Sequence, residues 1–147
     1  MTRINCSIQV ISLTDEHLLA EHREIKRLPT CTLKAISSGS INKSPKEFKL
    51  GSGHVLFFTK YGKYTLNRYK QIYNECIRRG FNVENYSTNW ECVPSTYMND
   101  LQESQNISNQ LVERITERIN SSNKTIFHYC GNKISKEDAI SLLKINI

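Results

Sequence analysis

The residues best suited to covalent chemistry lie near the start of the chain, at Thr2 and Glu24. The small second residue permits removal of Met1, which would leave Thr2 with a free α-amine. Because an α-amine has a pKa of about 7.7–8.0, a usable fraction is neutral and nucleophilic at physiological pH. Arg23 and Arg27 flank the Glu24 carboxylate. An amine, a carboxylate and cations that bind phosphates are the groups needed to attack a sugar carbon in DNA.

A helix over residues 12–27 is predicted to carry Glu24. A hydroxyl side chain can cap its start, acidic residues occupy its first turn, and Pro29 limits its end. Its apolar residues form one stripe, and its charged residues form another at spacings of three and four. Ala20 lies in the middle of the charged stripe, where its small side chain would let a bulky ligand approach.

Two further helices are predicted from apolar residues that repeat every three or four positions, over residues 64–79 and 107–119. A short helix is predicted after residue 135, and residues 36–53 and 82–105 are predicted to be loops. The apolar run 55–58 fits either a buried segment or a strand. The sequence therefore predicts an all-α fold, a single compact domain of three main helices with long loops.

The net charge of +6 is concentrated in the middle of the chain. Residues 34–82 contain ten basic and two acidic residues, a net charge of +8, which favours a polyanionic partner. The five cysteines include no C-x-x-C pair, so we expect free, mostly buried thiols and no zinc site. No signal region or membrane span is predicted, so we expect an intracellular, reducing location, not a secreted protein.

Several blocks of sequence match one known family in order and approximate spacing over residues 2–131. The blocks are Met1–Asn5, His17–Leu18, Ala20–Glu21, Arg23–Glu24, Gly51–Phe58 and Glu75–Asn82, followed more weakly by Arg114, Glu117–Ile119 and Thr125–Gly131. With these blocks the chain resembles the pyrimidine-dimer DNA glycosylase/AP lyases of the phage endonuclease V type. Several blocks in register are more specific than any one of them.

The resemblance implies a mechanism and a set of site residues. In this family the amine of an N-terminal Thr attacks the anomeric carbon of the damaged nucleotide, an imine forms, and β-elimination cuts the strand. The catalytic residues correspond to Thr2 and Glu24, whose carboxylate would stabilise the iminium cation and handle protons. The residues assigned to DNA binding are Arg3, Glu16, His17, Arg23, Arg27, Arg114, Arg118, Phe127 and Tyr129.

Within that set the resemblance assigns different contacts. Arg3, Arg23 and Arg27 would grip the lesion strand, whereas Arg114 and Arg118 would touch outer phosphates. Glu16 stands where the family has a Gln, and the aromatic residues Phe127 and Tyr129 would stack near the lesion, which the family exposes by flipping a base.

The resemblance also implies the partner and the domain limits. The expected partner of a monomeric protein is double-stranded DNA with pyrimidine dimers or abasic sites, with no metal, no cofactor and no membrane. The glycosylase-like helical domain would comprise residues 1–131, and residues 132–147 would form a C-terminal extension with a short helix.

Two other functions stay open on the sequence alone. A non-catalytic basic module could keep the scaffold and bind DNA without cleaving it. A helical interaction protein would show no salt-dependent affinity for DNA.

Overall fold

Helices make up 61% of the computed structural model, which describes residues 4–145. The elements, in order, are η1 (Val10–Ser12), α1 (Asp15–Ile25), α2 (Leu28–Ser38), η2 (Ser40–Lys43), α3 (His54–Phe58), α4 (Gly62–Arg78), η3 (Ser87–Cys92), η4 (Ser95–Tyr97), α5 (Gln105–Ser121), β1 (Ile126–Tyr129), β2 (Asn132–Ser135) and α6 (Lys136–Ile145). The predicted helical class is confirmed. The prediction of three main helices is corrected to six α-helices within residues 4–145, and the two-stranded sheet was not predicted.

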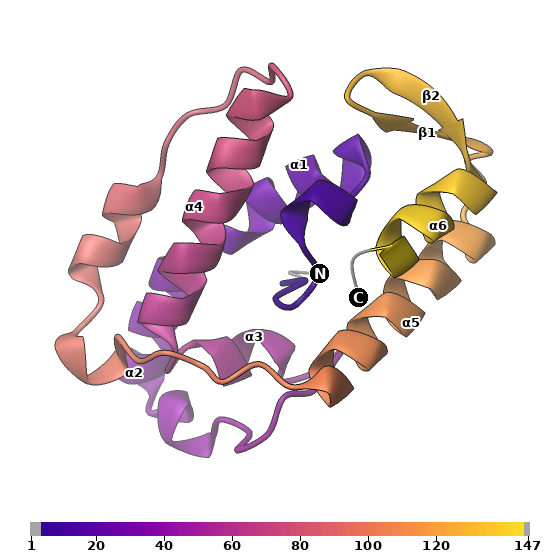
Figure 1. The fold of residues 1–147 in the computed structure, drawn as a ribbon. Coiled ribbons are helices and arrows are strands. Elements are labelled where there is room, and N and C mark those ends of the chain that lie inside the picture. Colours follow the sequence, from indigo (N-terminus) through magenta and orange to yellow (C-terminus); the bar gives the residue numbers. More distant parts are fainter. Residues whose placement is uncertain (1–3, 146–147) are drawn as a thin grey trace.

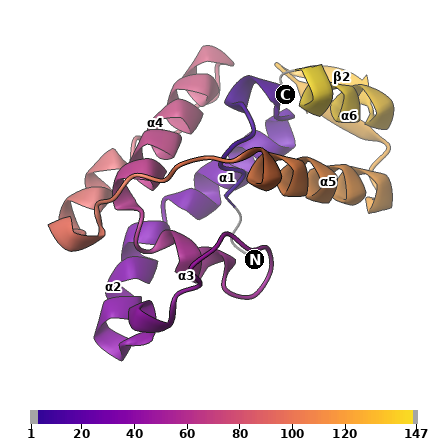
Figure 2. The ribbon, with the colours of Figure 1, turned by 60° about the horizontal axis from the view of Figure 1, so that its bottom comes forward.

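α1 lies in the middle of the molecule (Figures 1 and 2). α4 packs along one side of it, and the hairpin β1–β2, α5 and α6 lie on the other side. Within residues 4–145, no helix combines the length and the apolar character needed to cross a bilayer.

α1 and α2 follow each other closely along the chain. The Thr14 hydroxyl caps α1 by accepting a hydrogen bond from the backbone N–H of His17 at 3.2 Å. α1 ends at Ile25, and α2 begins at Leu28 with Pro29 in its first turn, where a missing N–H costs nothing. Pro29 therefore marks the start of a second helix as well as the limit of the first. Because α2 extends to Ser38, the loop predicted from residue 36 begins after that residue.

The other predicted elements agree with the structure more closely. The helices predicted over 64–79, 107–119 and after 135 correspond to α4, α5 and α6. Residues 82–105 hold only short 3-10 turns, as the polar sequence indicates. The run 55–58 is neither extended nor part of a sheet, because it forms most of the short helix α3.

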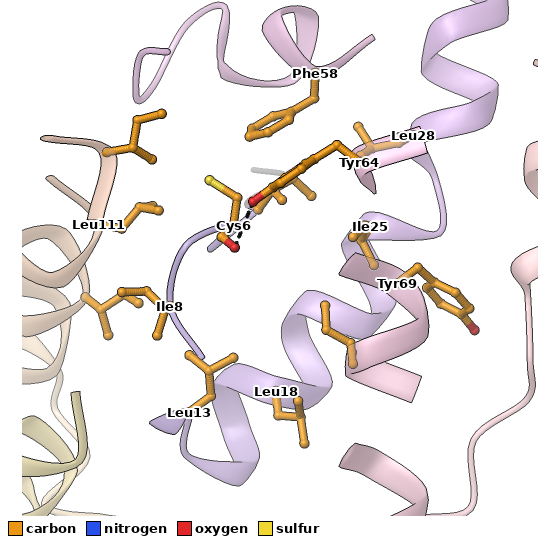
Figure 3. Packing of buried hydrophobic residues seen from close by; sticks show 14 of the residues in the cluster. Cys6, Ile8, Leu13, Leu18, Ile25, Leu28, Phe58, Tyr64, Tyr69 and Leu111 are labelled. Carbon is orange, nitrogen blue, oxygen red and sulfur yellow. Dashed lines mark hydrogen bonds between the residues drawn. The ribbon is translucent and has the colours of Figure 1, made fainter. Parts of the chain in front are cut away.

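The first described residues form part of the hydrophobic core. We call residues 4–9 the entry segment; it contributes the buried side chains of Ile4, Cys6 and Ile8. All three belong to one hydrophobic cluster with residues of α1, α4 and α5, and Figure 3 shows Cys6 and Ile8 between α1, Tyr64 and Leu111. The Tyr64 hydroxyl donates to the Cys6 carbonyl oxygen at 2.9 Å. This end of the chain is therefore held at the centre of the fold.

The predicted free thiols are only partly buried. Cys6 and Cys76 are buried and Cys31 is half-buried, whereas Cys92 and Cys130 are exposed. Burial raises the pKa of the Cys6 thiol to about 12 and that of Cys76 to about 11.

The hairpin is tied to the start of α1 by a buried carboxylate. Its turn residues Cys130 and Gly131 both have positive φ, 51° and 82°, as a type I′ turn requires. The Asp15 carboxylate accepts both of their backbone N–H groups, at 3.0 and 2.8 Å, and the Arg79 guanidinium at 2.9 Å. Arg79 also lies 4.5 Å from the centre of the Tyr129 ring. Asp15 thus joins α1, α4 and the hairpin.

The predicted domain boundary at residue 131 falls inside this hairpin turn. After it, α6 buries Ala139 and Leu143 in the same hydrophobic cluster as the entry segment. Residues 132–145 are accordingly packed on the rest of the chain.

Substitution of Asp15 should release the hairpin. We expect Asp15→Asn to destabilise the fold by about 3 kcal/mol, because the Arg79 side chain, 0% exposed, loses a charged partner. The amides of Cys130 and Gly131 should then exchange hydrogen faster, as NMR would measure. The control Asp138→Asn, in the exposed first turn of α6, should cost no more than about 1 kcal/mol. Unchanged amide protection in Asp15→Asn would contradict this role.

Candidate active site

A small pocket lies between α1, α5 and the entry segment. It has a volume of about 120 Å³, and its lining residues are Asn5, His17, Ala20, Glu21, Glu24, Ile115 and Arg118. The predicted charged face of α1 therefore borders a hollow, and Ala20 contributes to it as the sequence indicates. The pocket contains two carboxylates, a guanidinium and an imidazole close to the first described residues.

Glu24 is the more accessible of the two pocket carboxylates. Its side chain is 27% exposed, and Oε2 lies 3.4 Å from Nη1 of Arg27, whose side chain is 64% exposed. A pair this exposed contributes at most about 1 kcal/mol to stability. The Glu24 carboxylate is therefore free to respond to a ligand that enters the pocket.

Glu21, one turn before Glu24, is fully committed to a buried ion pair. Its Oε2 accepts from Nε of Arg68 at 2.8 Å, and its Oε1 accepts from Nη2 at 3.0 Å. The Asn5 amide donates to Oε1 at 2.9 Å. Burial alone would lower the pKa of Arg68, but the Glu21 carboxylate raises it. Glu21 therefore holds α1, α4 and the entry segment together.

The backbone of the entry segment is fixed at several points. The Nη1 atom of Arg68 donates to the carbonyl oxygens of Ile8 at 2.5 Å and Cys6 at 3.4 Å. The backbone N–H of Ile4 donates to Nε2 of His54 at 3.0 Å. The predicted site residues Thr2 and Arg3 lie outside the described residues, and the chain adjoining them is anchored at Ile4.

His17 is the pocket imidazole, and the hairpin covers it. Its ring stacks on that of Phe127, with 6.1 Å between centroids and 14° between planes. Burial lowers the pKa of His17, although Glu16 and Glu21 oppose this, so the ring is neutral at neutral pH. Phe127 is only 4% exposed, which makes it a support for His17 in this structure. Its predicted stacking on a base would require the ring to leave this contact.

The other two hairpin contacts involve predicted DNA-binding residues. The Glu16 carboxylate accepts the backbone N–H of His128 at 3.1 Å and pairs with its Nδ1 at 2.6 Å. Tyr129 stacks on Arg79, and its hydroxyl donates to the Ile11 carbonyl oxygen at 2.8 Å. Both side chains are thus engaged within the protein: Glu16 holds the hairpin on α1, and Tyr129 holds it on η1 and the end of α4.

The predicted arginines are spread over α1 and α5. Arg118 lines the pocket with Glu24, whereas Arg114 is half-buried one turn earlier on α5. Arg23 lies exposed on α1, and Arg27 lies exposed at the start of α2. Arg118 thus lies beside Glu24, and the division of the arginines into inner and outer phosphate contacts stays a prediction.

The basic middle of the chain is less basic at its surface than the sequence suggests. Three of its ten basic residues are paired within the protein: Arg68 with Glu21, Arg79 with Asp15 and Glu75, and Arg78 with Glu75. A sequence count of charge therefore overstates the charge available to a polyanion.

Comparison of the sequence with models of protein families identifies the family of this chain. The sequence model of the pyrimidine dimer DNA glycosylases matches residues 1–89. This chain belongs to the pyrimidine dimer DNA glycosylase family. The family expected from the sequence blocks is thus confirmed.

The part that matches the glycosylase family contains the entry segment, α1, α3 and α4. It therefore includes Glu24 and the groups that fix the entry segment, whereas Arg118 and the hairpin lie beyond residue 89. Sequence reasoning missed Asn5, Glu21 and Arg68 as site residues. The available signal was Arg68, a charged residue between Tyr64 and Ile72 on the buried face of α4.

The two pocket carboxylates should respond very differently to loss of charge. Glu21→Gln should lower the free energy of unfolding by about 3–5 kcal/mol, because Arg68 would be left buried without a counter-charge. Glu24→Gln should lower it by no more than about 1 kcal/mol. Urea denaturation of both variants measures the difference. Equal losses would contradict the division between a structural and a free carboxylate.

The hairpin should become less firmly attached in acid. Burial raises the pKa of Glu16, but the hydrogen bonds from His128 outweigh this and lower it below the ordinary 4.5. A depressed carboxylate pKa stabilises the fold above pH 4.5, and this stabilisation is lost as the pH falls through the folded-state value. The stability difference between wild type and Glu16→Gln should therefore shrink as the pH falls below 4.5, as urea titrations would show. A difference that is independent of pH would rule out this contribution.

Proposed function

We propose that this protein is a DNA glycosylase with AP lyase activity that acts at UV-induced pyrimidine dimers. The proposal assigns the nucleophile to the α-amine of Thr2, exposed by removal of Met1, and the assisting carboxylate to Glu24. The observation that carries it is the position of Glu24, in a pocket that the anchored entry segment helps to form.

The proposed reaction has two stages. The amine nitrogen attacks the anomeric carbon of the damaged nucleotide, and the electrons of the glycosidic bond leave with the base. Loss of a proton and opening of the sugar ring give an iminium ion. Removal of a proton from the neighbouring sugar carbon then expels the 3′ phosphate, which cuts the strand by β-elimination.

The chain geometry is compatible with this assignment. Two residues span at most roughly 7 Å, so the Thr2 amine is tethered within that distance of the Ile4 nitrogen. Ile4 is 0% exposed and held by His54, and the next residue, Asn5, lines the pocket. A tethered nucleophile needs little further ordering before it reacts.

Glu24 suits the carboxylate role better than the other acids of α1. Asp15, Glu16 and Glu21 each accept two or more hydrogen bonds within the protein. Glu24 pairs only with the exposed Arg27 among the described residues, and it can pair instead with a cation that develops in the pocket. The guanidinium groups of Arg23, Arg27 and Arg118 are the proposed contacts to phosphates of the lesion strand.

The proposed substrate is double-stranded DNA with pyrimidine dimers or abasic sites. Damaged pairs are the least costly to unstack, and that favours attack at the lesion. The reaction as written uses only the chain's amine and carboxylate, and we propose that a monomer carries it out inside the cell.

Borohydride trapping tests this function directly. Reduction of the imine should attach wild-type protein covalently to dimer-containing DNA, and mass mapping should find the adduct on Thr2. Glu24→Gln should lose at least about 100-fold in strand cleavage while its binding to the same duplex persists, because the change removes charge and keeps shape. The control Glu91→Gln, in the exposed turn η3, should cleave like wild type.

The outcomes separate this proposal from its alternatives. Salt-dependent binding without any trapped adduct would identify a non-catalytic DNA-binding module. An adduct that maps to a lysine would overturn the assignment of the nucleophile and leave the lyase reaction standing.

A further inference from the structure

The backbone N–H of Ile4 is paired with a side chain 50 residues away. It donates to Nε2 of His54 at 3.0 Å in the buried core, and the other ring nitrogen, Nδ1, lies 3.0 Å from the carbonyl oxygen of Lys49. Since the Ile4 N–H is a donor, Nε2 must carry a lone pair, and the proton must sit on Nδ1. Only neutral imidazole in this one tautomer can make both bonds.

The surroundings of His54 hold the ring in that state and orientation. The side chain is 2% exposed, and its ring meets those of Phe48 and Phe58 edge-on, with centroids 5.5 and 5.2 Å away. Burial lowers the pKa of His54, and the bond to Lys49 and the charge of Glu21 oppose this only in part. The imidazole is thus a fixed acceptor at neutral pH.

The glycine-rich turn before His54 shapes this acceptor. Gly53 has φ +88°, and a Cβ there would lie 3.2 Å from Cδ of Lys49 and 3.2 Å from Cγ of Pro45. The backbone N–H of His54 donates to the Gly51 carbonyl oxygen at 3.1 Å, which closes the turn. A side chain at position 53 would crowd Pro45 and the Lys49 side chain, and its unfavourable positive φ would strain the turn that places the imidazole.

We propose that His54 is a positioning residue for the reaction, which sets where the N-terminal amine lies by fixing the Ile4 backbone. This inference rests on the proposed function. Thr2 precedes Ile4 by two residues, so a shift of the Ile4 nitrogen is transmitted to the amine along at most roughly 7 Å of chain. His54 itself does not line the pocket, so its effect reaches the reaction through the backbone.

The test separates amine chemistry from DNA binding. The rate of borohydride trapping is measured at saturating protein on a duplex with a single abasic site, and the dissociation constant is measured on the same duplex. His54→Phe keeps the ring and removes the acceptor, so trapping should slow by roughly 100-fold with a much smaller change in affinity. His54→Gln places a carbonyl oxygen near the position of Nε2 and should regain most of the rate.

Two matched controls distinguish positioning from a general loss of stability. Trp90→Phe removes a buried hydrogen bond to Thr65 elsewhere in the core and should trap at the wild-type rate. Gly39→Ala and Gly53→Ala both force a side chain into positive φ, but Gly39 has no atom within 4 Å of the added carbon. Gly53→Ala should slow trapping and Gly39→Ala should not, which keeps the test valid if His54→Phe fails to fold.

A spectroscopic measurement tests the contact without any reaction. In ¹⁵N-labelled wild-type protein, a coupling across the hydrogen bond should connect the Ile4 amide with Nε2 of His54, and it should vanish in His54→Phe. If the wild type is trapped and both His54→Phe and Gly53→Ala are trapped at the wild-type rate, this inference is wrong and the proposed function stands. Absence of trapping by the wild type would instead overturn the proposed function, and this inference with it.

Discussion

The buried ion pair between Glu21 and Arg68 is the interaction on which the rest of the site depends. The guanidinium uses two of its nitrogens for the carboxylate and its third for the carbonyl oxygens of Cys6 and Ile8. A charge buried this deeply is tolerable only when its donors are satisfied, so the entry segment must occupy its observed position. The pair therefore fixes α1 against α4 and holds the start of the chain beside the pocket.

A single helix supplies four carboxylates with four different surroundings. Asp15 accepts hydrogen bonds from the hairpin turn, and Glu16 accepts one from His128 of β1. Glu21 pairs with Arg68 inside the core, and Glu24 faces the pocket. Three of them are saturated by internal donors, which leaves Glu24 as the α1 acid best able to meet an external cation. The role proposed for Glu24 thus follows from the internal hydrogen bonds that already engage the other three carboxylates.

The sequence predicted local features well and distant contacts poorly. The cap and the apolar stripe predicted α1, and several sequence blocks in register identified the family. The sequence predicts Pro29 only as the limit of the first helix, because a proline that ends one helix and a proline that opens the next look alike in sequence. The pairing of Glu21 with Arg68 joins residues 47 positions apart, and no spacing rule within one sequence predicts it. The hairpin was missed because its turn depends on positive φ at Cys130, a residue type that rarely adopts it.

The central location of the entry segment also governs the order in which the chain can fold. Three of its hydrogen-bond partners, His54, Tyr64 and Arg68, are separated from it by 50 to 62 residues. The helices can form early from local contacts, but this segment cannot be buried until α4 exists and the intervening loop has closed. The entry segment is therefore among the last of the described parts to reach its native surroundings, and completion of the pocket coincides with completion of the core.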